Sequence, residues 1–208
     1  MKNGGNGFKR TDFDAIAGWI RPGSRVLDLG CGDGVLLKYL KGARDITGYG
    51  VEIDDANVLA CVTNGVNVIQ SDLERGLSEF ETGSFDYVIL SQTIQATRRP
   101  RWVLEQMLRI GKHVIVSFPN FGHWRIRFQL LRRGRMPITD RLNDSWYDTQ
   151  NIHFCTIRDF VELVNDVDAK IERGIALDRW GRPVRLNAPW EFWNFFGEQG
   201  LFLLTRKG

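Results

Sequence analysis

Three glycines at alternate positions follow a short apolar run that carries an acid. The stretch is Asp28-x-Gly30-x-Gly32-x-Gly34, and Val26–Leu29 would form the strand that leads into it. Glycine tolerates positive φ and lets a ligand approach the backbone closely. A strand that passes through a glycine turn into a helix presents a nucleotide at the carboxyl edge of an open α/β sheet. We therefore expect a nucleotide-binding loop here.

Two further acids lie at the ends of later predicted strands. Glu52 ends the second strand and Asp72 follows the third. A carboxylate can accept two hydrogen bonds from the vicinal hydroxyls of a ribose, and the acid after the second strand is where this sheet type binds ribose. The acid after the third strand can accept a hydrogen bond from the exocyclic amine of adenine. These positions together predict a site for an adenine nucleoside.

The glycine spacing separates the possible ligands. A dinucleotide fingerprint is GxGxxG, whereas this chain has GxGxG, and no Lys-Ser/Thr pair follows as it would in a P-loop. Asp28, two residues before the first glycine, would repel a pyrophosphate. It would suit the amino group or the sulfonium of S-adenosylmethionine.

The elements that must position these residues alternate along the chain. Patterns of apolar residues predict strands at 26–29, 48–53, 66–70, 85–90, 113–118, 170–177 and 201–205. They predict helices at 11–20, 35–40, 58–62, 102–110 and 156–164. Thr11 with Asp14, and Thr156 with Asp159, have the capping-box form, and Asp54 is a candidate N-cap. The alternation predicts a doubly wound, mostly parallel sheet, with the last two strands, joined by a loop over 178–200, pairing antiparallel.

Composition bounds the class of protein. The chain has 208 residues, 43% of them apolar and 25% charged, which suits one domain over 1–208. No run of 18 apolar residues predicts a membrane span, and the polar start lacks the apolar core of a signal peptide. Three cysteines without CxxC spacing, Cys31, Cys61 and Cys155, favour reduced cytoplasmic thiols over disulfides or a metal site. A net charge of +3 is too small to indicate nucleic acid by itself.

The segment 119–151 has little strand character and is expected to be an irregular insertion, or lid, over the carboxyl edge of the sheet. Its basic residues are Arg125, Arg127, Arg132, Arg133, Arg135 and Arg141. Phe121, Trp124, Phe128 and Leu131 would share one helical face. An acidic protein partner, RNA or an ordinary lid could explain this pattern, and we favour the lid or the partner. The aromatics between Trp180 and Phe196 suit core packing and a protein interface equally.

The glycine loop and the two acids resemble the class I S-adenosylmethionine-dependent methyltransferases. That resemblance implies a Rossmann-like sheet of seven strands whose last strand is antiparallel. It implies that the loop cradles the methionine part, that Glu52 holds the ribose, that Asp72 and Leu73 frame the adenine, and that Ser91 lies beside the methionine moiety. The implied cofactor-binding residues are Asp28, Gly30, Cys31, Gly32, Gly34, Glu52, Ile53, Asp72, Leu73 and Ser91.

Nearly the whole chain is similar to the MetW family of methionine biosynthesis proteins. The resemblance rests on 91–95 (SQTIQ), 118–124 (FPNFGHW), 134–137 (GRMP), 146–149 (WYDT) and 151–156 (NIHFCT). It implies a protein that binds S-adenosylmethionine or S-adenosylhomocysteine and acts with, or regulates, homoserine O-acyltransferase. A methyltransferase of small molecules is the alternative, and an RNA-modifying enzyme ranks last.

Candidate general bases are scarce, so the sequence leaves it undecided whether the chain is an enzyme. Gln92 and Gln95 follow the fourth predicted strand and cannot remove a proton. His153 could act as a base, but packing at the start of the next helix is favoured. Tyr147 and Asp148 could contact a substrate, although loop packing is again favoured.

Overall fold

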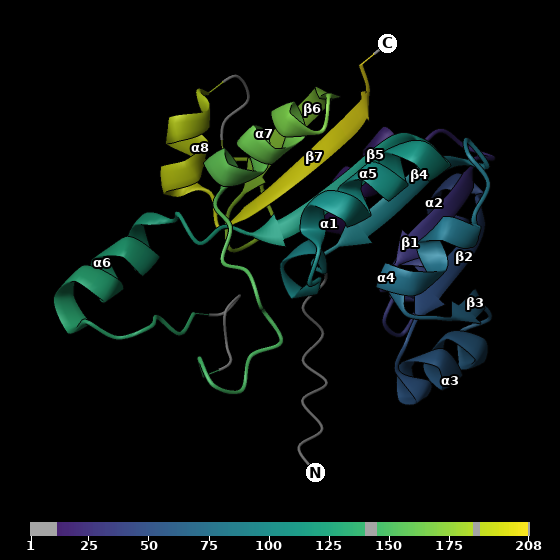
Figure 1. Ribbon diagram of the computed structural model, residues 1–208, viewed down its shortest axis with the longest axis horizontal. Helices are drawn as coiled ribbons and strands as arrows, with labels where there is room; N and C mark the ends of the chain where they lie inside the picture. Colours follow the sequence, from purple (N-terminus) through teal and green to yellow (C-terminus); the bar gives the residue numbers. More distant parts are fainter. Residues whose placement is uncertain (1–11, 140–144, 185–187, 208) are drawn as a thin grey trace.

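The computed structural model describes residues 12–139, 145–184 and 188–207. One twisted sheet runs through the molecule, in the order β3-β2-β1-β4-β5-β7-β6 (Figure 1). Its strands are β1 (Arg25–Leu29), β2 (Thr47–Glu52), β3 (Asn67–Gln70), β4 (Phe85–Ser91), β5 (Gly111–Pro119), β6 (Ala169–Leu177) and β7 (Gln199–Arg206).

The strand directions confirm the predicted topology. β1 to β5 pair in parallel with their neighbours, whereas β7 lies between β5 and β6 and is antiparallel to both. The order reverses between β1 and β4, so the loops that follow these two strands diverge at that point. In open α/β sheets this divergence opens the crevice in which ligands bind.

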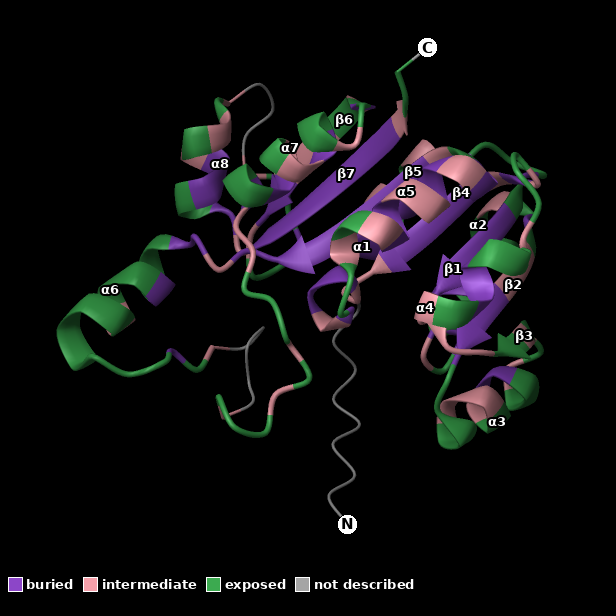
Figure 2. Ribbon diagram, viewed as in Figure 1, coloured by how far each residue is buried: buried purple, intermediate pink, exposed green. Residues whose placement is uncertain are grey.

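Helices cover both faces of the sheet. They are α1 (Asp12–Trp19), α2 (Val35–Arg44), α3 (Asp55–Thr63), α4 (Leu73–Gly76), α5 (Pro100–Ile110), α6 (Trp124–Arg133), α7 (Ile157–Asp166) and α8 (Trp190–Phe196), with 3₁₀ turns η1 (Leu77–Glu79) and η2 (Ile94–Ala96). Alternate strand residues pack on opposite faces: Leu27 and Leu29 lie in the core beneath α5, α7 and α8, and Val26 lies in the core beneath α1 and α2. Burial accordingly concentrates in the strands (Figure 2).

Local capping signals placed two helices correctly. Asp54 accepts a hydrogen bond from Asn57 N at 3.0 Å and begins α3. Thr156 and Asp159 form the reciprocal capping box of α7. The Thr11 cap of the first helix and the polar start of the chain lie outside the described residues. No helix of the described ranges is both long enough and apolar enough to cross a membrane.

The stretch 178–200 was expected to be a loop, and that expectation was wrong, because α8 lies within it. The segment 119–151 contains α6, which agrees with the helical face expected there although the segment as a whole was expected to be irregular. The α8 sequence, WEFWNFF, has aromatics on every side and therefore no apolar period to detect. Long-range packing selects its helix, because Trp193 and Asn194 are buried against the rest of the fold.

A buried asparagine joins the end of β5 to α7 and α8. The Asn120 side chain donates to Asn194 O at 2.9 Å and to Gly197 O at 2.7 Å. Its Oδ1 accepts from Gly122 N at 3.0 Å and from Ile157 N at 3.2 Å. A Cβ on Gly122 would lie 2.5 Å from Asn194 Oδ1, so only glycine permits this arrangement. These bonds also fix the root of α6.

Asn120→Ala should lower the free energy of unfolding by about 2–4 kcal/mol, because two buried carbonyls and the Gly122 N–H lose the Asn120 side chain as a partner, whereas the Ile157 N–H keeps Asn194 Oδ1 at 3.1 Å. Urea unfolding followed by circular dichroism measures this. The matched control is Asn165→Ala on the exposed side of α7, which should change stability by less than about 0.5 kcal/mol. Equal losses for the two variants would contradict the assigned role of Asn120.

Candidate functional site

The glycine loop turns at the carboxyl end of β1 with three residues in left-handed backbone. The φ angles are 64° at Gly30, 56° at Gly32 and 74° at Gly34. Gly30 N and Cys31 N both donate to Val51 O of β2, at 2.8 and 3.1 Å. The loop is therefore fastened to the neighbouring strand before α2 begins.

The Glu52 carboxylate completes this attachment. Its Oε2 accepts from Gly32 N at 2.8 Å, and its Oε1 accepts from Ile53 N at 2.8 Å and from Asp54 N at 3.0 Å. The side chain is 8% exposed. Three backbone donors compensate the cost of burying the charged carboxylate. Glu52 thus shapes the loop in addition to the ribose contact that the sequence predicts for it.

The three glycines serve different purposes. A Cβ on Gly30 would lie 2.8 Å from Thr93 Cγ2, and one on Gly34 would lie 3.0 Å from Cys61 Sγ, so these two positions permit close packing. A Cβ on Gly32 would meet no atom within 4 Å. Because Gly32 lines the cavity described below, its missing side chain keeps space open for a ligand.

Two buried thiols lie behind the loop. Cys31 Sγ and Cys61 Sγ are 3.7 Å apart, and the Cys61 thiol donates to Gly32 O at 3.1 Å. Burial is the main cause that raises the pKa of both thiols, with the nearby carboxylates adding to it. They are protonated at neutral pH, and the Cys31 side chain packs against Gly50, so a ligand would meet only the Cys31 backbone.

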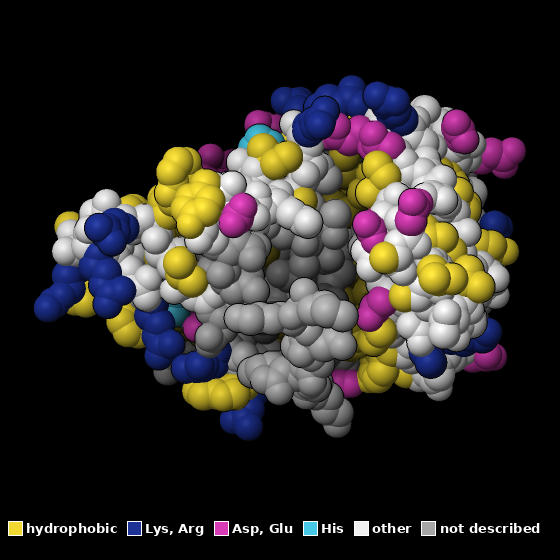
Figure 3. Space-filling model, turned by 90° about the horizontal axis from the view of Figure 1, so that it is seen from below, with side chains coloured by type: hydrophobic (Ala, Val, Ile, Leu, Met, Phe, Trp, Pro, Cys, Tyr) yellow, Lys and Arg dark blue, Asp and Glu magenta, His cyan; other side chains and the backbone are white. Residues whose placement is uncertain are grey.

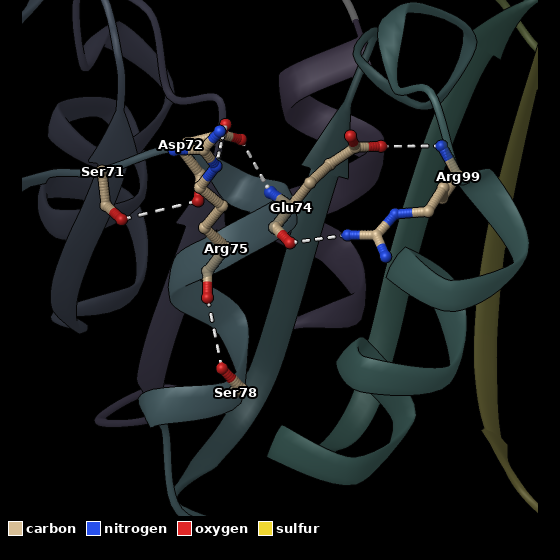
Figure 4. A network of polar contacts seen from close by, with 6 residues as sticks. All are labelled: Ser71, Asp72, Glu74, Arg75, Ser78 and Arg99. Atoms are coloured by element: carbon tan, nitrogen blue, oxygen red, sulfur yellow. Dashed lines mark hydrogen bonds and ion pairs between the residues drawn. The ribbon is translucent and has the colours of Figure 1, made fainter.

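Asp72 lies between the end of β3 and α4 (Figure 4). Its Oδ1 accepts from Glu74 N at 2.9 Å, and its Oδ2 lies 3.7 Å from Arg75 Nε. Glu74 Oε1 in turn accepts from Arg99 N at 2.7 Å, and the Arg99 guanidinium donates to Glu74 O at 2.8 Å. This network holds α4 against the start of α5. The N–H of Leu73, the first residue of α4, faces no partner within its helix and can donate outward.

The chain after β4 forms the opposite wall. Ser91 Oγ lies 3.2 Å from Ser117 Oγ, and Gln92 Nε2 donates to the same Ser117 oxygen at 3.1 Å. Gln92 has φ of 59°, which is unusual for a residue other than glycine. Gln95 O accepts from the N–H groups of Ile152 and His153, both at 2.9 Å. These bonds fix the end of the inserted segment at the carboxyl edge of the sheet.

A cavity of about 1090 Å³ opens between these walls. Of the ten predicted cofactor residues, six line it: Gly30, Gly32, Glu52, Ile53, Asp72 and Leu73. Asp28, Cys31, Gly34 and Ser91 are not among the residues that line it. Thr149 and Gln150 are the described residues of 119–151 at the cavity wall, whereas α6 extends away from it (Figure 1).

The cavity is rich in carboxylates, and each one has a structural partner. Glu52, Asp54, Asp72 and Glu74 each accept at least one backbone N–H. Asp28 is buried beneath the loop and adds a fifth acid near the site. In the described part of the chain, no group of three His, Cys, Asp or Glu side chains could hold a metal ion. The arrangement can bind a cationic nucleoside, and each carboxylate in the cavity wall already accepts a backbone N–H.

Some functional positions could not be read from the sequence. The left-handed backbone of Gln92 and the contact of Thr93 with Gly30 depend on strands distant along the chain, and no motif marks them. His153, expected to be packed, has an exposed side chain. The histidine that is buried is His123 at the start of α6, where burial and Arg125 lower its pKa to about 4. It is neutral at physiological pH.

The chain has relatives in sequence. A family model described as methionine biosynthesis protein MetW matches residues 10–204. The bifunctional methionine biosynthesis protein MetXA/MetW of Rhodopirellula baltica is 37% identical over 176 residues. That match covers 80% of this chain and 28% of the relative, so the chain spans little more than a quarter of the relative's length.

Solved structures share the fold. An S-adenosylmethionine dependent methyltransferase from Mesorhizobium loti has a TM-score of 0.69 at 14% identity, with 95% of this chain and 99% of that one covered. A SAM dependent methyltransferase from Archaeoglobus fulgidus has a TM-score of 0.67 at 16% identity, with 95% and 92% covered. At this identity the likeness identifies the class I methyltransferase fold, as the resemblance implied.

The thiols provide a test of the loop geometry. At about pH 8 the folded chain should react with iodoacetamide at Cys31 and Cys61 at least a hundredfold more slowly than the same chain in concentrated urea, because burial and raised pKa values suppress the thiolate. Cys155, whose pKa burial raises to about 12, should behave likewise. Mass spectrometry of the alkylated peptides measures this. Rapid labelling of Cys31 in the folded protein would contradict the packing described for the loop.

Proposed function

Because the chain belongs to the MetW family of methionine biosynthesis proteins, we propose that it binds S-adenosylmethionine or S-adenosylhomocysteine and that it acts with, or regulates, homoserine O-acyltransferase. The single observation that carries the ligand proposal is the open face of Gly32. There a loop fastened by Glu52 meets a cavity that carries acids after β2 and β3.

Charge supports this ligand over a dinucleotide. The carboxylates that line the cavity and the buried Asp28 would repel a pyrophosphate. They would attract the amino group and the sulfonium of S-adenosylmethionine. Within the cavity, we assign the ribose to Glu52 and Ile53 and the adenine to Asp72 and Leu73. The methionine part would lie along Gly30–Gly32 beside the chain that follows Ser91.

The engaged carboxylates favour a binding role over methyl transfer. A methyltransferase that acts on a hydroxyl or an amine often needs a general base. The four carboxylates that line the cavity are committed to capping helices or shaping loops, and Gln92 at its wall is neutral. The cavity volume of about 1090 Å³ supports a second candidate, a methyltransferase of small molecules, because it is large for one drug-sized ligand.

The fused relative supports the choice of partner. Its name joins MetXA and MetW in one polypeptide, and the chain matches 28% of its length. Two units joined in one chain meet at high effective concentration, which is useful when they work together. We take the other unit to be the acyltransferase that the family resemblance implies. A ligand derived from methionine would then report the output of the pathway to an early enzyme.

Gly32→Ala should weaken binding of S-adenosylmethionine at least tenfold, because the new methyl group would project into the cavity. Isothermal titration calorimetry measures the affinity. The matched control is Gly23→Ala, since Gly23 also has positive φ and open space around its Cβ but lies in the turn before β1. Both variants should lose about 1 kcal/mol of stability, and only the first should lose affinity. Equal affinities would refute the assigned site. Substitution of Glu52 would not separate a lost ribose contact from a changed loop, because it would also remove the bonds that hold the loop.

The partnership is tested by mixing purified homoserine O-acyltransferase with this chain. We expect the two proteins to elute together in gel filtration. We also expect the acylation rate to change when the chain is added, and to change again when S-adenosylmethionine or S-adenosylhomocysteine is supplied. The Gly32→Ala chain should form the complex and lose the response to ligand. The absence of both a complex and a change of rate would refute the regulatory role. Release of S-adenosylhomocysteine on adding a metabolite extract would favour the methyltransferase.

A further inference from the structure

A helical arm projects from the sheet with an apolar face that the described residues do not cover. We define the α6 arm as residues 121–138. Ile126 is the buried residue of α6, whereas Trp124, Phe128 and Leu131 are 40%, 54% and 85% exposed. Figure 2 shows the helix largely in the colour of exposed residues. A soluble helix normally buries its apolar stripe, so this face needs another explanation.

The exposed apolar residues lie on the side of the helix opposite its anchor. Trp124, Phe128 and Leu131 follow helical spacing and share one face, and Ile126 points to the other. Arg125 and Arg132 flank this stripe on one side, and Arg127 flanks it on the other. Figure 3 shows arginines and apolar side chains intermixed at this end of the molecule. The spacing noted in the sequence is thus a real amphipathic face, turned outward.

The arm is held firmly at its root. Asn120 fixes the end of β5, and Arg127 Nε donates to Gly122 O at 2.6 Å. The Arg127 guanidinium also lies 5.6 Å from the centre of the Phe195 ring on α8. Gly134, with φ of 58°, ends the helix. A surface presented in one orientation loses little conformational entropy when it binds, which is a property of a docking site.

The charge of the arm defines its partner. Residues 121–138 contain five arginines and no aspartate or glutamate. Arginine and aromatic residues are enriched at the centres of protein interfaces. A second copy of this chain would set five arginines against five, which disfavours self-association through this face. The complementary surface is an apolar groove bordered by carboxylates.

We propose that the α6 arm is the docking surface for homoserine O-acyltransferase, which would present such an acidic, apolar groove. This inference rests on the proposed function, and it assigns to that partner a place on the molecule. The relative that carries MetXA and MetW in one polypeptide supports a protein over a membrane or RNA as the occupant. The position also suits regulation, because the chain that leaves the arm returns to the ligand cavity at Thr149 and Gln150.

The test compares two matched pairs of exposed apolar residues. Phe128→Ser with Leu131→Ser changes the arm, and Leu59→Ser with Val62→Ser changes α3, where those residues are 68% and 62% exposed at the same spacing. The arm variant should bind the acyltransferase at least tenfold more weakly in calorimetry, and the α3 variant should bind like the unchanged chain. Both should keep their affinity for S-adenosylmethionine, which shows that they are folded. Arg132→Glu with Arg133→Glu should also weaken the complex.

The outcomes separate this inference from the proposed function. If the unchanged chain does not bind the acyltransferase, the proposed function fails and the inference falls with it. If the unchanged chain binds and the arm variant binds equally well, the inference alone is overturned. A different partner would also overturn the inference. This would be the case if the unchanged chain sedimented with vesicles of acidic phospholipid or bound RNA, and the arm variant lost that binding while it still bound the acyltransferase.

Discussion

The carboxylate of Glu52 is the interaction on which the candidate site depends. It is buried, and it accepts three backbone N–H groups, one from the glycine loop after β1 and two from the start of the chain after β2. A buried carboxylate with fewer donors would be costly, so each donor constrains the others to stay in place. These bonds hold the glycine loop against the start of the chain after β2, with Gly32 facing the cavity.

Features specified by neighbouring residues could be predicted from the sequence. The alternation of apolar runs gave the seven strands, because the period of burial is a local property. The antiparallel pairing of the last two strands was expected because no helix was expected between them, and the pairing is confirmed although α8 lies between them. Asp54 and Thr156 marked the starts of α3 and α7, because a cap acts within one turn. Glu52 and Asp72 both line the cavity, since parallel strands bring their carboxyl ends to one edge.

Features specified by distant residues could not be predicted. Asn120 bonds to Asn194 and Gly197, and no local pattern indicates that pairing. The helix α8 forms because Trp193 is buried beneath it, although its aromatic sequence has no period. The apolar spacing from Phe121 to Leu131 was recognised, but its outward direction was not. A single sequence records that a residue is apolar, and only the assembled fold decides whether the residue faces the core or a partner.

The position of β7 has a consequence for how the molecule is made. β7 lies between β5 and β6, and β6 has no other strand neighbour in the described sheet. While a ribosome synthesises the chain, β6 therefore has no strand to pair with, and the outer edge of β5 stays unpaired, until residues 199–206 emerge. Open edges and long-range pairing slow folding and invite aggregation. We infer that the first five strands can assemble early and that β7 closes the fold as one late, cooperative step.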